Sequence, residues 1–244
     1  MNEEERREGI HTGQLLYSKC CQFLDEIDEF ADTNHHEALA GMVNDYAQQR
    51  VLVDASSIAV NRFLEDDQYT VRYVNTFFQQ IPPLINEMFR AADPDETGIK
   101  ELTDIYREWG PLCETVVQPM VAIVHYAEND EVDLYKAEEM NFHDQLKLLR
   151  EHHHLEPVAE HLHVKHRNAF AHGEWIPNQI AEEVTMFYSS ADGRVEVTYS
   201  IEEFRELVVK TVSAVMALFI APMYLVSAYA SIEITAILAS MDES

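Results

Sequence analysis

Hydrophobic residues recur at three- and four-residue steps through most of the chain, the spacing that places side chains on one face of a helix. The first such run predicts a helix over residues 12–31, preceded by a polar segment, residues 1–11, that we expect to be disordered. A second helix is predicted over residues 35–64, and a third begins at residue 67 and ends or kinks at Pro82-Pro83. The chain has few glycines and prolines for tight turns, so a mainly α-helical fold is favoured.

Proline and glycine interrupt the next stretch of the chain. Residues 93–98 contain the clearest loop signal of the first half. Helices are predicted over residues 99–109 and 112–126 with a break at Gly110-Pro111, because proline lacks a backbone donor and clashes with the preceding turn. Pro119 is expected to kink the second of these helices.

An acidic run at residues 128–131 marks the predicted boundary between two parts of the chain. The first part, residues 1–128, is an N-terminal helical region for which the pattern indicates no function. The second part, residues 129–244, is predicted to be a helical domain that begins with a helix over residues 132–153.

The second part then changes from a helical to an alternating pattern. A helix is predicted over residues 157–172, with a proline in its first turn and Gly173 as its stop. Alternating runs on either side of Asp192-Gly193 predict a β-hairpin over about residues 184–199. The Ser-x-x-Glu sequence at residues 200–203 is a capping box that begins the last long helix. The predicted fold is therefore a helical bundle with one small β-hairpin.

Residues 211–231 carry no formal charge, and as a helix this segment would be long enough to span a bilayer. The segment also contains Pro222 and several serines, alanines and tyrosines, and no strong basic cluster flanks it. A buried or subunit-interface helix is therefore favoured, and a membrane-associated helical protein is the alternative. The polar residues 1–8 do not resemble a signal peptide, so we expect a cytoplasmic protein.

The charge of the chain is unusual. Asp and Glu number 44 against 17 Lys and Arg, a formal net charge of -27. The negative charges of such a surface repel one another at low salt, and they also repel the phosphates of a nucleic acid. Any nucleic-acid binding must therefore be confined to a small part of the surface. The three cysteines, Cys20, Cys21 and Cys113, include no CxxC spacing, so neither a disulfide framework nor a thiolate zinc site is expected.

Histidine is concentrated in one window of the chain. Eight of the twelve histidines lie between residues 143 and 172, namely His143, His152, His153, His154, His161, His163, His166 and His172. Four acidic and four basic residues balance within the same window. An anionic substrate would therefore be repelled least here. Metal binding is not expected, because imidazoles two and three residues apart do not converge on one point of a straight helix.

Within this window, Arg167, Asn168 and His172 form the strongest candidate site. Asn168 and His172 are four residues apart, so they share one helix face. His172 lies in the last turn, where the helix dipole favours a positive charge and a histidine suits proton transfer. The guanidinium of Arg167 offers a planar fork for a phosphate. Lys165 and His166, just before them, are candidate contacts to RNA phosphates.

The sequence Arg-Asn-x-x-x-His over residues 167–172 resembles the signature of HEPN domains, which are small helical bundles. Gly173 and the hairpin that follows extend the resemblance to residues 130–240. The resemblance implies a metal-independent endoribonuclease without a cofactor, in which two motif copies meet across a homodimer. His172 would be the acid–base group, Arg167 would hold the scissile phosphate, and Asn168 would orient its neighbours. It also implies a toxin or defence effector with an antitoxin or other regulatory protein as partner.

Each of these residues also has a purely structural interpretation. Arg167 could pair with an acid such as Glu160 or Glu174, Asn168 could cap or bridge helices, and His172 could be a surface histidine at a helix end. Lys165 and His166 could belong to a solvated face. The alternative function is then a catalytically inactive, HEPN-like module that binds a protein or a nucleotide.

The charge predicts that the protein is adapted to high salt. Because the Debye length falls to about 3 Å at 1 M salt, added KCl should screen the repulsion between carboxylates. The melting temperature, followed by circular dichroism, should therefore rise as KCl is increased. A melting temperature that does not change with KCl would contradict the hypothesis.

Overall fold

The computed structural model of the protein describes residues 3–46, 97–129, 139–190 and 193–242. These residues form a mainly α-helical structure with one small antiparallel sheet, as predicted. The part of the second predicted helix beyond residue 46, the third predicted helix and its Pro82-Pro83 end lie outside the described residues.

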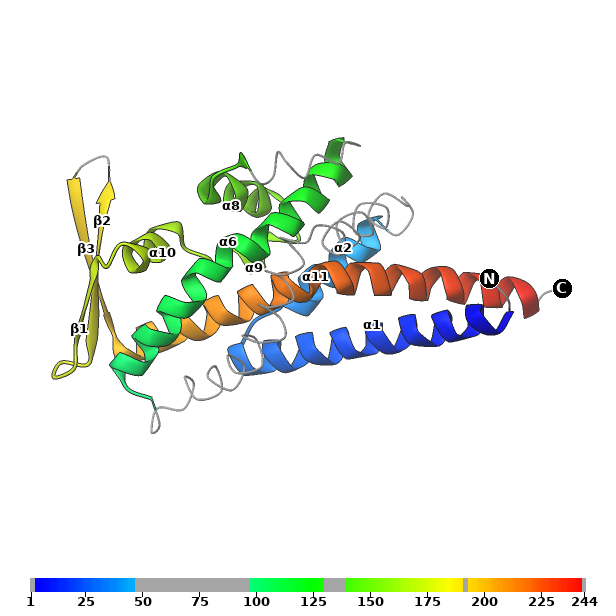
Figure 1. Ribbon diagram of the computed structural model, residues 1–244, viewed down its shortest axis with the longest axis horizontal. Coiled ribbons are helices and arrows are strands. Elements are labelled where there is room, and N and C mark those ends of the chain that lie inside the picture. The colour runs from blue at the N-terminus through cyan, green and yellow to red at the C-terminus, as the bar shows by residue number, and fades with distance from the viewer. Residues whose placement is uncertain (1–2, 47–96, 130–138, 191–192, 243–244) are drawn as a thin grey trace.

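Two long helices run antiparallel and side by side along the molecule (Figure 1). They are α1 (Glu3–Ala31) and α11 (Ile201–Asp242), and the start of α1 lies near the end of α11. Helix α1 begins at Glu3, so the expectation of a disordered segment over residues 1–11 is wrong from that residue onward. Helix α2 (His35–Tyr46) packs against both of them.

Helix α6 (Ile99–Asn129) crosses α11 and is continuous, so the predicted break at Gly110-Pro111 is wrong. A proline inside a helix costs about 3 kcal/mol because it removes a hydrogen bond and crowds the preceding turn. The apolar side chains on either side of it, among them Trp109, Cys113 and Val117, are almost completely buried. Each large apolar side chain contributes about 1.5–3 kcal/mol on burial, so packing outweighs the cost of the proline.

The hydrophobic core is shared by both parts of the chain. Leu24 of α1, Trp109 of α6 and Phe204 of α11 belong to one cluster of buried side chains. The described residues on the two sides of position 129 therefore pack around a common core. The boundary itself adjoins residues 130–138, which lie outside the described part.

The charge-free segment lies within α11. Ile201–Ala228 is the one span among the described residues that is long and apolar enough to cross a membrane, and 89% of its most apolar window is buried inside the protein. Burial of this extent is typical of the core helix of a soluble protein. It agrees with the favoured prediction of a buried helix over the described part of residues 211–231.

The histidine-rich window consists of three helices rather than two. Helix α8 (Phe142–Glu151) begins after the N-cap Asn141, whose Oδ1 accepts the Asp144 N–H at 3.1 Å, so the predicted helix over residues 132–153 is interrupted. The predicted helix over residues 157–172 is also wrong in its middle. Helix α9 (Glu156–Ala159) ends, and α10 (Val164–Ala171) begins only after a break.

Donors from neighbouring helices stabilise the break between α9 and α10. Arg150 of α8 donates from Nε to the carbonyl oxygen of Ala159 at 3.3 Å and from Nη2 to that of Leu162 at 2.7 Å. The Thr211 hydroxyl of α11 donates to the carbonyl oxygen of His161 at 3.1 Å. The side chains of Arg150 and Thr211 thus bond carbonyl groups at the break, and the Ala159 carbonyl also accepts the Leu162 N–H at 3.2 Å. This tertiary support leaves no local signal in the sequence.

The sheet lies at the end of the molecule where α11 begins (Figure 1). Its strands β1 (Trp175–Asn178), β2 (Glu183–Ser190) and β3 (Gly193–Ser200) are antiparallel in the order β1-β2-β3. The β2–β3 pair confirms the predicted hairpin, whereas β1, a short edge strand that contains a proline, was not predicted. The capping box is also confirmed. The Ser200 N–H donates to Glu203 Oε2 at 2.9 Å, and the Glu203 N–H donates to Ser200 Oγ at 3.3 Å.

The role of Arg150 can be tested by its replacement. Arg150→Met should lower the free energy of unfolding by about 1–3 kcal/mol, because two carbonyl groups lose a charged donor. Lys147→Met is the matched control, because Lys147 lies on the same helix and makes only an exposed ion pair with Glu151 at 3.8 Å. That control should stay within about 0.5 kcal/mol of the wild type in urea unfolding. Equal losses in the two variants would contradict the role assigned to Arg150.

Candidate active site

Helix α10 carries the motif and is anchored by the ring of Phe170. This ring lies 4.7 Å from that of Tyr106 on α6, 4.8 Å from that of Trp175 on β1 and 6.0 Å from that of Phe204 on α11, measured between centroids. Aromatic pairs at such distances contribute beyond the area that they bury. The short helix is therefore held against three elements, and Trp175, the first residue of β1, belongs to this packing.

The end of α10 is fixed by a glycine in the left-handed conformation. Gly173 has a φ of 69°, and the N–H of Glu174 donates to the carbonyl oxygen of Ala169 at 2.7 Å. The Gly173 N–H donates to the carbonyl oxygen of Phe170 at 3.3 Å. These two bonds form a Schellman motif, which confirms the predicted stop. His172 is the C-cap residue, and its side chain is exposed to solvent.

Arg167 lies against α6 and is held by two partners. Its Nη2 lies 2.6 Å from Oε2 of Glu114, and its Nη1 donates to Oδ1 of Asn168 at 3.0 Å. Its Nε is buried, with no hydrogen-bond partner among the described residues. The side chain is 22% exposed. Arg167 thus forms an ion pair, as its structural interpretation requires, but with Glu114 instead of Glu160 or Glu174.

Sequence reasoning did not identify Glu114. It lies far from the motif along the chain, and nothing distinguishes it among 44 acidic residues. The contact forms because α6 and α10 pack together, and even an added Cβ at Gly110, one turn earlier on α6, would make only an ordinary 3.9 Å contact with Cγ of Arg167. Cys113, the residue before Glu114, is no candidate nucleophile because burial raises its thiol pKa to about 12, with only partial opposition from Arg167.

The two candidate phosphate contacts differ in their surroundings. Lys165 is exposed, and its Nζ lies 5.0 Å from the centre of the Tyr188 ring. His166 is only 9% exposed, and its Nε2 lies 2.9 Å from the hydroxyl of Tyr199. Burial lowers the pKa of His166 to about 4, with smaller contributions from His163 and Lys165, so the ring is neutral at pH 7. Of the two side chains, only Lys165 lies on the surface with a positive charge.

Three other histidines of the window, His152, His153 and His154, have their rings close together. The rings of His153 and His154 lie 3.8 Å apart, and that of His152 lies 5.4 Å from His153. Within the described part of the chain, no group of three or more His, Cys, Asp or Glu side chains is placed to hold a metal ion. His161 and His163 instead line a small pocket beside the first turns of α11, which sequence reasoning did not identify.

Comparisons with models of protein families, with curated proteins and with solved structures find no match for this chain. The resemblance to HEPN domains therefore depends on the motif residues and on the elements that follow them. Of the three motif residues, the structure joins Arg167 and Asn168 by a hydrogen bond and places His172 one helical turn beyond Asn168.

The buried histidines predict a loss of stability in acid. Burial lowers the pKa of both His35 and His166 to about 4, from an ordinary value of 6.5. Between these values the unfolded chain binds more protons than the folded one, so stability is complete above about pH 6.5 and falls towards pH 4. Because one pKa unit corresponds to about 1.4 kcal/mol, each residue should cost about 1–2 kcal/mol between pH 7 and pH 5.

The measurement is the free energy of unfolding in urea across this range. His166→Gln should make the free energy of unfolding fall less steeply between pH 7 and pH 5. His143→Gln, at an exposed position on α8, should leave this pH dependence unchanged. If His166→Gln kept the wild-type slope, the assignment would be wrong.

Proposed function

We propose that this protein is a metal-independent endoribonuclease of the HEPN type, with Arg167, Asn168 and His172 as its catalytic residues. One observation carries the proposal. Arg167 and Asn168 are joined side by side by a 3.0 Å hydrogen bond on a short, well-anchored helix, and the exposed His172 follows one turn later on the same helix. The helix thus carries a phosphate-binding group and a proton-transfer group in a fixed relation.

The proposed reaction uses the 2′-hydroxyl of the substrate. A base removes its proton, the 2′-oxygen attacks the phosphorus, and the bond from phosphorus to the 5′-oxygen breaks as that oxygen takes a proton. The products are a 2′,3′-cyclic phosphate and a 5′-hydroxyl. Arg167 stabilises the charge that develops on the phosphoryl oxygens, and His172 transfers protons at the surface of the site.

The partners of Arg167 have a defined part in this scheme. Glu114 and Asn168 hold the guanidinium in one orientation, which spares the entropy of ordering a long side chain during the reaction. The exposed Lys165 on the same helix supplies a further contact to the RNA backbone. Its positive charge matters because a chain with a net charge of -27 repels RNA elsewhere.

We infer a homodimer as the active form. The reaction needs one group to accept a proton and another to donate one, and each chain supplies one His172. Two copies of the motif across a shared cleft provide both groups. Ile176 on β1, close to His172 along the chain, is 58% exposed, and a second subunit would cover it. We further place the protein in the cytoplasm as a toxin or defence effector, held in check by an antitoxin or other regulatory protein.

The ion pair between Arg167 and Glu114 also favours a second candidate function. A neutralised arginine that bridges α10 and α6 is a structural element, and the fold would then serve as a catalytically inactive module that binds a protein or a nucleotide. The two candidates differ in whether RNA is cleaved.

The test is the cleavage of a structured RNA by protein purified in high KCl, with EDTA present. The wild type should cleave. His172→Ala and Arg167→Ala should each lose about 100-fold or more in rate, as expected for an acid–base group and for a group that stabilises the transition state. The matched controls are His143→Ala and Arg107→Ala, which alter an exposed histidine on α8 and an exposed arginine on α6. Both should retain the wild-type rate.

Several outcomes would overturn the proposal. If the wild type and both site variants cleave equally, or if none cleaves, the enzyme hypothesis fails. Abolition of cleavage by EDTA would point to a metal-dependent reaction. An active species that sedimentation shows to be strictly monomeric would contradict the composite cleft.

A further inference from the structure

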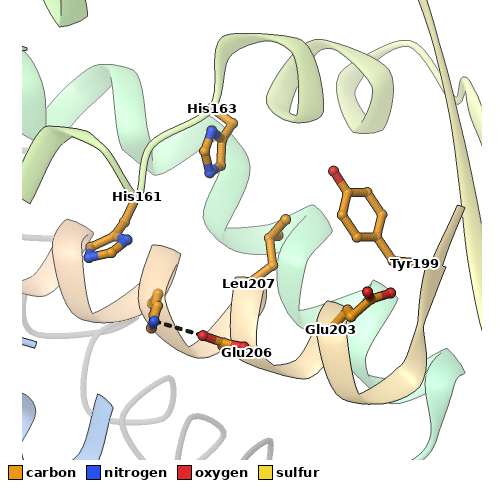
Figure 2. Close-up of a pocket in the computed structure, with 7 residues that line it drawn as sticks. His161, His163, Tyr199, Glu203, Glu206 and Leu207 are labelled. Carbon is orange, nitrogen blue, oxygen red and sulfur yellow. Dashed lines mark hydrogen bonds and ion pairs between the residues drawn. The ribbon is translucent and has the colours of Figure 1, made fainter. Parts of the chain in front are cut away.

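A small pocket lies between the α9–α10 connection, the end of β3 and the first turns of α11 (Figure 2). Its volume is about 240 Å³. The side chains that line it are His161, His163, Tyr199, Glu203, Glu206, Leu207 and Lys210. Drug-sized ligands occupy pockets of about 300–1,000 Å³, so this one has room for a single flat ring system.

The polar groups of the pocket include two carboxylates, one ammonium group and three rings that can donate or accept a hydrogen bond. Glu203 and Glu206 project from α11 towards it, and Lys210 compensates only one of the two charges through a 2.7 Å bond to Glu206. Oε2 of Glu203 accepts the Ser200 N–H, which fixes this carboxylate at the rim of the pocket. The pocket therefore carries a net negative charge. It opposes a phosphate and favours a neutral group with N–H donors.

Rings occupy the other sides of the pocket. His161 and His163 face α11 from the α9–α10 connection, and Tyr199 closes one end (Figure 2). Burial is the main cause that lowers the pKa of both histidines, so neutral rings are present at pH 7. The hydroxyl of Tyr199 lies 2.9 Å from Nε2 of His166, which holds the tyrosine in place. Such rings suit stacking against a flat heterocycle, the usual way in which proteins hold an unpaired base.

The pocket is joined to the proposed catalytic helix. His163 is the N-cap of α10 and His172 is its C-cap. At a rise of 1.5 Å per residue, the helix separates their backbones by about 13 Å. A strand of RNA whose backbone passes His172 can therefore place a nearby base at the pocket.

We propose that this pocket binds an unpaired guanine base and so directs where the RNA is cut. The proposal rests on the ribonuclease function. Guanine fits best because its Watson–Crick edge presents two adjacent N–H donors to carboxylate acceptors. On the same edge, adenine and cytosine each present one amino donor next to an acceptor nitrogen. Uracil presents a single N–H donor between two carbonyl oxygens. The carboxylate oxygens of Glu203 and Glu206 that are left without a donor among the described residues, Oε1 and Oε2 respectively, therefore discriminate against all three.

Nucleoside binding tests the pocket without any cleavage. Guanosine, inosine, adenosine, cytidine and uridine are titrated into the full chain in high KCl and followed by saturation-transfer NMR. Guanosine should bind most tightly, and inosine, which lacks the 2-amino donor, should bind several-fold more weakly. Glu203→Gln should lower the affinity for guanosine by about tenfold, because a hydrogen bond to a charged acceptor is lost.

The variants are chosen to keep the fold. Glutamine also serves in a capping box, so Glu203→Gln retains an acceptor for the Ser200 N–H. Glu202→Gln is the matched control, since it removes the same charge from an exposed neighbour on the same turn that does not line the pocket. This control should bind guanosine like the wild type. His172→Ala should also bind it normally.

The outcomes separate this proposal from the ribonuclease itself. Cleavage on one side of unpaired guanines, with the preference lost in Glu203→Gln and kept in Glu202→Gln, supports both the guanine pocket and the ribonuclease. Cleavage without base preference, together with no guanosine binding, overturns the guanine pocket and leaves the enzyme standing. Guanosine binding without cleavage overturns the enzyme and the pocket's role in cutting. Uridine or the diamine putrescine binding as tightly as guanosine overturns the guanine assignment.

Discussion

The hydrogen bonds from Arg150 to the carbonyl oxygens of Ala159 and Leu162 determine how the motif is presented. One continuous helix from Glu156 to Ala171 would instead satisfy these oxygens with backbone N–H groups. The break makes α10 a separate helix with its own direction, and its Phe170 reaches the rings of Tyr106, Trp175 and Phe204. Arg150 thereby supports the segment that leads into α10, whose ends are His163 beside the pocket and His172 at the surface.

The ion pair of Arg167 with Glu114 connects this helix to the core. Its atoms lie 2.6 Å apart, and the arginine is mostly buried. Salt screens exposed charges far more than partly buried ones. High salt would therefore relieve the repulsion between surface carboxylates while the α10–α6 connection persists. This acidic chain can therefore keep the Arg167 guanidinium in a mostly buried ion pair while its surface carries many negative charges.

Features that the sequence predicted correctly have local causes. The Ser200–Glu203 capping box, the stop at Gly173 and the β2–β3 hairpin each depend on residues a few positions apart. The errors have tertiary causes. Burial of Trp109 and its neighbours stabilises α6 as a continuous helix across Gly110-Pro111. The hydrogen bonds of Arg150 stabilise the end of α9, where no glycine or proline is present.

The same distinction applies to the candidate site. Arg167, Asn168 and His172 were recognisable because they are close together in the chain and form a pattern. Glu114 was not, since its contact with Arg167 exists only after α6 and α10 pack together. Tyr199, Glu203, Glu206 and Lys210 were missed for the same reason, because only the fold brings them opposite His161 and His163.

The two ends of α10 have opposite electrostatic preferences. At its start, the carboxylates of Glu203 and Glu206 disfavour an anion and favour N–H donors. Along its length, the exposed Lys165 favours an anion, Arg167 is paired with Glu114, and His172 is exposed at the far end. A small anion would satisfy one end only, and a neutral heterocycle only the other. A polymer that alternates charged phosphates with uncharged bases would satisfy both at once, which is the physical argument for our proposal that the ligand is single-stranded RNA.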